Sequence, residues 1–131
     1  MIKIVEFNEE TNAKKAYKEV MKVEMEAEAK NRIVKCIASA NRFAFLIKEP
    51  QQNGEEHLVL YIYDLKATKY QGFINLTQNL GIPDLSKQQY DIIFSSGALK
   101  GCLTIFTKDT LYLIAENSRN GQPGKWSLIR K

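Results

Sequence analysis

The stretch MKVEMEAEAK, residues 21–30, decides how much of this chain is helix and how much is sheet. Apolar and charged residues alternate through it, which is the period of a β-strand. Its composition opposes that pattern, because Met, Glu, Ala and Lys are good helix formers and Val23 is its only β-branched residue. Summed over the whole stretch, these preferences favour a helix.

The residues before this stretch extend the helical pattern. Asn8-Glu9-Glu10-Thr11 has the chemistry of a helix start, since Asn accepts a hydrogen bond from a first-turn amide and the acids oppose the helix dipole. Apolar residues then recur at steps of three and four: Ala13, Ala16, Tyr17, Val20, Val23 and Ala27. The sequence therefore predicts an amphipathic helix over about 9–30, with a helix that ends near Lys18 and an extra strand as the alternative.

From Arg32 onwards β-branched and aromatic residues dominate, which favours strands. Turn sequences such as Asn53-Gly54 separate most of the segments, and short connections make neighbouring strands antiparallel. A turn of helix is expected near Leu85. Including a first strand over 1–7, the predicted strands are 1–7, 33–37, 43–47, 57–65, 70–76, 90–94, 102–107, 110–115 and 125–129.

The predicted fold class is α+β. The chain of 131 residues is expected to form a single domain, 1–131, in which the helix at about 9–30 packs on a mostly antiparallel sheet of about six to eight strands spanning about 32–131. The alternative is a mainly-β meander or a partial β-propeller-like fragment. Two segments, 42–61 and 109–128, echo each other with a polar Asn-Gly loop between strands, which fits two similar hairpins or an internal duplication.

Residues 42–76 resemble one blade of a WD40-type β-propeller, in the rhythm RFAFLI, HLVLYIYDLK and YQGFINL. The Trp-Asp dipeptide typical of that family is absent, and Tyr63-Asp64 is the nearest substitute. A closed propeller needs about four blades or more and this length holds about two at most, so the resemblance bears on the fold only if the chain is a piece of something larger.

The positive charge is concentrated at the C-terminal end. Residues 98–131 contain six basic and only two acidic residues, which accounts for the whole net charge of +4. The same segment holds the only Trp, and Trp and Arg often anchor protein interfaces. The predicted binding residues are Lys100, Arg119, Lys125, Trp126, Arg130 and Lys131.

No catalytic, metal or cofactor signature is present in the sequence. There is a single histidine, His57, which is expected to be exposed at a loop edge beside Glu55 and Glu56. Cys36 and Cys102 have no metal-ligand spacing and are expected to be buried thiols. A cysteine-dependent hydrolase that pairs Cys102 with His57 is a remote alternative. No cofactor is expected.

The sequence therefore predicts a non-catalytic binding or adaptor module that recognises another protein through a basic, β-rich C-terminal surface. An acidic partner would complement this charge. The alternative is nucleic-acid binding, in which cations contact phosphates and Tyr70, Tyr112 or Trp126 stack on bases. The chain has neither a secretory signal nor a membrane-length apolar run, so a cytoplasmic location with no membrane partner is expected.

Overall fold

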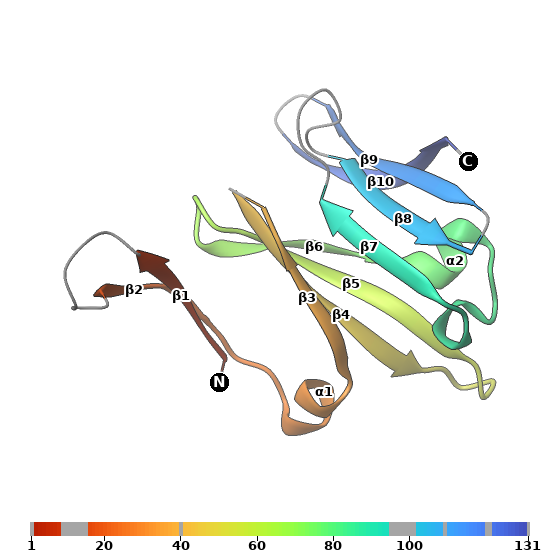
Figure 1. The fold of residues 1–131 in the computed structure, drawn as a ribbon, viewed down its shortest axis with the longest axis horizontal. Helices are drawn as coiled ribbons and strands as arrows, with labels where there is room; N and C mark the ends of the chain where they lie inside the picture. Colours follow the sequence, from red (N-terminus) through yellow and green to blue (C-terminus); the bar gives the residue numbers. More distant parts are fainter. Residues whose placement is uncertain are drawn as a thin grey trace.

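The computed structural model describes residues 2–8, 16–39, 41–94, 102–108, 110–119 and 122–130. Within these residues the protein is mostly antiparallel β-sheet, arranged as three sheets with a few short helices (Figure 1). The strands are β1 (Ile2–Asn8), β2 (Ala16–Val23), β3 (Ile33–Ala38), β4 (Arg42–Pro50), β5 (Glu56–Asp64), β6 (Lys69–Asn75), β7 (Tyr90–Phe94), β8 (Cys102–Thr107), β9 (Leu111–Arg119) and β10 (Gln122–Arg130). The helices are α1 (Ala27–Asn31), α2 (Leu76–Leu80) and a 3-10 turn, η1 (Leu85–Lys87).

Two four-stranded sheets form the body of the fold. The first sheet has the strand order β3-β4-β5-β6, and the second sheet has the order β10-β9-β8-β7. Each is a meander in which consecutive strands pair antiparallel, as the short connections predict. The predicted strands from residue 33 onwards are confirmed, and so is the helical turn near Leu85. The prediction that they form one sheet of about six to eight strands is wrong, because they divide into two sheets of four.

The main core lies between these two sheets. It combines Ile37, Leu46 and Leu60 of the first sheet with Ile92 and Ile105 of the second. The first strands of the two sheets, β3 and β7, contact each other, and so do the last strands, β6 and β10. The ion pair between Lys35 of β3 and Asp91 of β7 also joins the two sheets at this edge.

The predicted N-terminal helix over about 9–30 is wrong. Residues 16–23 form β2, which pairs with β1 in a two-stranded antiparallel sheet, and the only helix in the described part of this range is α1. Residues 9–15 lie outside the described residues. The alternation in MKVEMEAEAK is a true strand signal only at its start, where Val23 is buried while Lys22 is exposed, whereas residues 27–30 of the same stretch belong to α1.

The reason is tertiary packing. Val23 joins Phe43, Phe45 and Ile47 in a second apolar cluster on the face of the first sheet that points away from the main core. Ile2, Ile4, Met21 and Met25 pack against this cluster. A strand places Met21 and Val23 on one side, and this burial outweighs helix preferences worth only tenths of a kcal/mol per residue.

The two segments that echo each other occupy different places in their sheets. Residues 42–61 include β4 and the start of β5, the second and third strands of the first sheet, whereas 109–128 include β9 and most of β10, the third and fourth strands of the second. Both are hairpins, but a duplicated sheet would align β4 with β8. The echo is therefore one of single hairpins and does not extend to the two sheets as wholes.

Residues 42–76, which resemble a propeller blade, contain β4, β5 and β6, three consecutive strands of the first sheet. The strand rhythm behind the resemblance is confirmed. Membership of a propeller remains a prediction.

Candidate interaction surface

Four of the six predicted binding residues lie in one β-hairpin. Arg119 is the last residue of β9, while Lys125, Trp126 and Arg130 belong to β10. In the pairing of the two strands, Lys125 is opposite Asn117, Trp126 opposite Glu116 and Arg130 opposite Leu113. Lys100 and Lys131 lie outside the described residues. Within the described residues β10 is an edge strand of its sheet, so one side of its backbone pairs with no other strand, although β10 also contacts α2 and β6.

The outer face of the second sheet, which points away from the main core, carries large apolar side chains. Ile93 of β7, Phe106 of β8 and Leu111 of β9 are exposed by 44%, 43% and 43%, respectively. Their immediate neighbours along the chain, Ile92 and Ile105, are buried in the main core. The side-chain alternation of a strand places the exposed residues on the opposite face.

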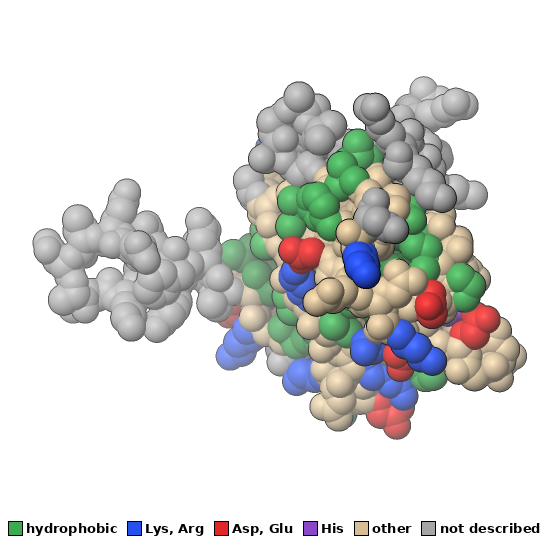
Figure 2. Space-filling model, turned by 45° about the vertical axis from the view of Figure 1, so that its right-hand side comes forward, with side chains coloured by type: hydrophobic (Ala, Val, Ile, Leu, Met, Phe, Trp, Pro, Cys, Tyr) green, Lys and Arg blue, Asp and Glu red, His purple; other side chains and the backbone are tan. Residues whose placement is uncertain are grey.

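The register of the strands brings these exposed residues close to one another. Phe106 lies directly opposite Leu111 across the β8–β9 pair, and opposite Asp91 across the β7–β8 pair. Ile93 lies opposite Thr104, two pairs further along and therefore on the same face. Figure 2 shows several groups of hydrophobic side chains on one face of the described surface, with most of the Lys, Arg, Asp and Glu side chains of that face below them. We call Ile93, Phe106 and Leu111 the apolar patch.

Sequence reasoning missed this patch although a signal for it was present. Both faces of β7, β8 and β9 are rich in apolar residues, as in the pairs Ile92-Ile93 and Ile105-Phe106. Strands with one solvated face alternate apolar and polar residues, whereas strands covered on both faces read as continuous apolar runs. The consecutive apolar residues of β7, β8 and β9 therefore indicate a sheet whose outer face is also packed against another surface.

A second exposed apolar region lies on the first sheet. Tyr70 and Phe73 of β6 are exposed by 48% and 61%, and their rings contact those of Tyr63 and Tyr61, respectively. Tyr70 is therefore accessible for stacking, as the nucleic-acid alternative requires. Tyr112 is not, since it is 5% exposed within the main core, so its assignment as a base-stacking residue was wrong.

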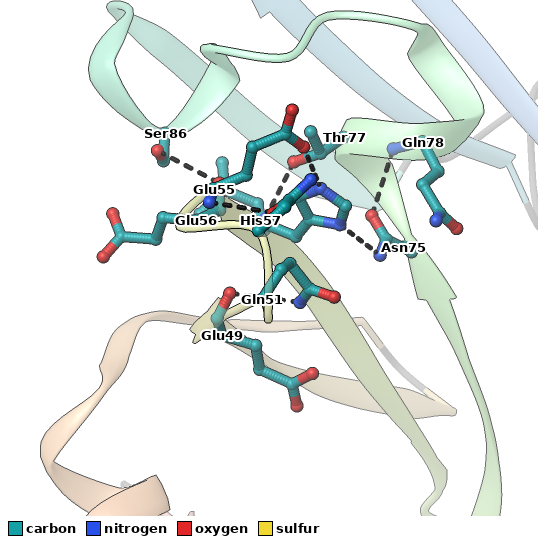
Figure 3. Close-up of polar contacts among 11 residues, drawn as sticks. Glu49, Gln51, Glu55, Glu56, His57, Asn75, Thr77, Gln78 and Ser86 are labelled. Carbon is teal, nitrogen blue, oxygen red and sulfur yellow. Dashed lines mark hydrogen bonds and ion pairs between the residues drawn. The ribbon is translucent and has the colours of Figure 1, made fainter.

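His57 is buried, and the prediction of an exposed histidine at a loop edge is wrong. It is 6% exposed and both ring nitrogens have partners (Figure 3). Its Nε2 lies 3.0 Å from Oε2 of Glu55, and its Nδ1 lies 2.9 Å from Nδ2 of Asn75. The hydrogen bonds from His57 and from the side chain of Asn53 lower the pKa of Glu55.

This histidine ties the β4–β5 turn to α2. Oδ1 of Asn75 accepts a hydrogen bond of 3.0 Å from the backbone N–H of Gln78 and so caps the helix. Thr77, also buried, accepts a bond of 2.9 Å from the backbone N–H of Leu58. Figure 3 shows these side chains converging between the end of β4, the start of β5 and α2.

A cavity of about 700 Å³ opens beside this network. Polar and apolar groups line it in nearly equal measure, and its polar residues come from the turn, the start of β5 and α2, including Gln51, Asn53, Glu55, His57 and Gln78. No charged group other than Glu55 lines it within the part of the chain that the structure describes. The cavity therefore offers polar contacts without a charge cluster.

The geometry does not favour a cysteine-dependent site. His57 engages Glu55 and Asn75 through its two ring nitrogens, so neither nitrogen is directed at a thiol. The side chain of Cys36 is exposed, so the expectation that it is buried is wrong. Desolvation by the neighbouring groups nevertheless raises the pKa of its thiol. Cys102 is the first residue of β8 and pairs with Ala115. In the described ranges, no group of three or more His, Cys, Asp or Glu side chains is placed to hold a metal ion.

Comparisons with known proteins give no match: no family model fits the chain, and neither curated proteins nor solved structures are significantly similar to it. Among the described residues, none of the helices is long and apolar enough to cross a membrane.

Proposed function

We propose that this chain is a non-catalytic protein-binding module that docks its partner on the outer face of the second sheet and the β9–β10 hairpin. The observation that carries the proposal is the apolar patch of Ile93, Phe106 and Leu111, whose members lie on three neighbouring strands. Large exposed apolar residues that gather on one face mark interaction sites more often than scattered ones do.

The charge of the same sheet suggests the chemistry of the partner. The predicted cations Arg119, Lys125 and Arg130 belong to β9 and β10, so the patch and the cations share one sheet. Interfaces commonly have an apolar centre and a polar rim. A complementary partner has an apolar contact surface bordered by acidic residues, and such a module would act as a cytoplasmic adaptor.

The test compares partner capture by the wild-type chain and a charge-neutral variant, Lys125→Gln/Arg130→Gln/Lys131→Gln, from nuclease-treated extract. A matched control, Lys30→Gln/Lys66→Gln/Lys87→Gln, removes the same charge from exposed positions elsewhere. We expect the C-terminal variant to bind the recovered partner roughly ten-fold more weakly, which corresponds to about 1.4 kcal/mol, while the control binds like the wild type. Equal binding by the two variants would show that the hairpin is not part of the interface.

Nucleic-acid binding is the second candidate, and the exposure of Tyr70 and Phe73 favours it. These rings lie on β6 of the first sheet, whereas the predicted cations lie on the second. The two candidates respond differently to salt, because counterion release makes nucleic-acid affinity fall steeply as the salt concentration rises. Capture that disappears after nuclease treatment and at moderate salt would favour nucleic acid over protein.

A further inference from the structure

The hydrogen bonds around His57 fix where its proton resides. Asn75 uses Oδ1 to accept from the backbone N–H of Gln78, so its NH₂ group faces Nδ1 of His57. An NH₂ group only donates, and Nδ1 must therefore accept. In the neutral ring the proton then sits on Nε2, which donates to the carboxylate of Glu55.

A second proton cannot enter this arrangement without breaking it. Protonation would place an N–H on Nδ1, directly facing the NH₂ group of Asn75 at 2.9 Å, so that two donors oppose each other. The conflict is relieved if the Asn75 amide turns over and presents Oδ1 to the ring. The amide then no longer accepts from Gln78 N–H, and α2 loses its cap.

Several charged groups lie on the elements that surround His57. They are Glu55 and Glu56 at the end of the turn, Lys48 and Glu49 of β4, and Asp84 and Lys87 at η1. Of these, Glu55 hydrogen-bonds the ring and would form an ion pair with the protonated form. Glu49, opposite His57 in the β4–β5 register, accepts from Tyr61, and Asp84 accepts from Gln88.

We propose that His57 is a proton-operated switch for the N-terminal cap of α2, in which protonation exchanges the Asn75–Gln78 hydrogen bond for an Asn75–His57 hydrogen bond. The ion pair with Glu55 retains the ring in its place while the cap is released. Since α2 joins the first sheet to the second and contacts β5 and β10, the change reaches the connection between the sheets. The switch does not depend on the proposed partner.

The experiment follows the His57 ring nitrogens and the Gln78 backbone amide of the full chain by NMR between pH 8 and pH 5. At pH 8 the ring should be the Nε2–H tautomer, and the Nδ1–H tautomer would overturn the proposal. As His57 takes up its second proton, the hydrogen-exchange protection of the Gln78 amide, corrected for intrinsic rate, should fall about five-fold, as expected for loss of a cap. Unchanged protection across the titration would also overturn it.

Two variants separate the switch from a merely structural role. Asn75→Asp keeps a capping oxygen for Gln78 and adds a second carboxylate oxygen that can accept from Nδ1–H. In this variant Gln78 should stay protected throughout the same pH range, because the carboxylate caps α2 and accepts from the ring at once. In His57→Gln the protection of Gln78 should not vary over this pH range. A fall in Gln78 protection in either variant as large as in the wild type would refute the mechanism.

Discussion

Phe106 and its neighbour Ile105 offer a direct test of the apolar patch, because they belong to one strand and face opposite ways. Ile105 is 1% exposed in the main core, whereas Phe106 is 43% exposed on the outer face. A Phe side chain presents roughly 200 Å² of surface, so roughly 85 Å² remains available to a partner. At about 25 cal/mol per Å², covering this area contributes about 2 kcal/mol to binding, or roughly thirty-fold in Kd.

The assay measures two quantities for each variant: the free energy of unfolding by denaturant, and the Kd for the recovered partner by titration. Phe106→Ser should change stability by less than about 1 kcal/mol while weakening binding roughly thirty-fold. Ile105→Ala should lower stability by about 2–5 kcal/mol through the cavity it leaves. If Phe106→Ser binds like the wild type, the outer face of the second sheet is not the interface. If it destabilises as much as Ile105→Ala, the assignment of the two faces is wrong.

Three further predictions concern single side chains. Thr77→Val should lower the unfolding free energy by about 1–3 kcal/mol, because it leaves the buried N–H of Leu58 without its acceptor, and Thr77→Ser should restore most of the loss in denaturant melts. Burial and the hydrogen bond to Glu49 raise the pKa of Tyr61, so the stability that its neutral form contributes is complete below about pH 10 and is lost at more alkaline pH. Tyr61→Phe should remove only the most alkaline part of the phenolate absorbance titration. The raised pKa of Cys36 should make its exposed thiol alkylate more slowly than a free thiol at pH 7, with the gap closing as pH rises, as followed by mass spectrometry.

The β-rich part of the fold could be predicted because its information is local. Segments such as 43–47 and 90–94 combine β-branched and aromatic residues with flanking turn sequences, and they form β4 and β7. The turn at Asn53-Gly54 is one example: Gly54 has a positive φ of 85°, and the side chain of Asn53 accepts from the N–H of Glu55. Such turn chemistry is legible in sequence.

The N-terminal element could not be predicted in this way because its decisive contacts are distant. Met21 and Val23 pack with Phe43 and Phe45, which follow some twenty residues later and belong to another sheet. Local propensity carries no information on that contact. The burial of His57 has the same origin, since its partner Asn75 lies on the next strand and is 18 residues away.

The candidate site likewise combines one feature that the sequence reveals and one that it does not. The concentration of cations in 98–131 is visible in the sequence, and the structure brings Arg119, Lys125 and Arg130 to one hairpin. The apolar patch depends on register, because only the pairing of β7, β8 and β9 places Ile93, Phe106 and Leu111 together. A shift of one residue in any of these strands would exchange core and surface residues.

The two four-stranded sheets differ in how their apolar faces are covered, and this difference is the strongest physical reason to expect a partner. The first sheet has a core on one face and, on part of the other, the cluster that β1 and β2 help to form. The second sheet has the main core on one face, while on its other face Ile93, Phe106 and Leu111 are exposed. Covering those residues would gain free energy from the same burial that folds the first sheet. A partner that supplies a complementary apolar surface would therefore do for the second sheet what the N-terminal hairpin does for the first.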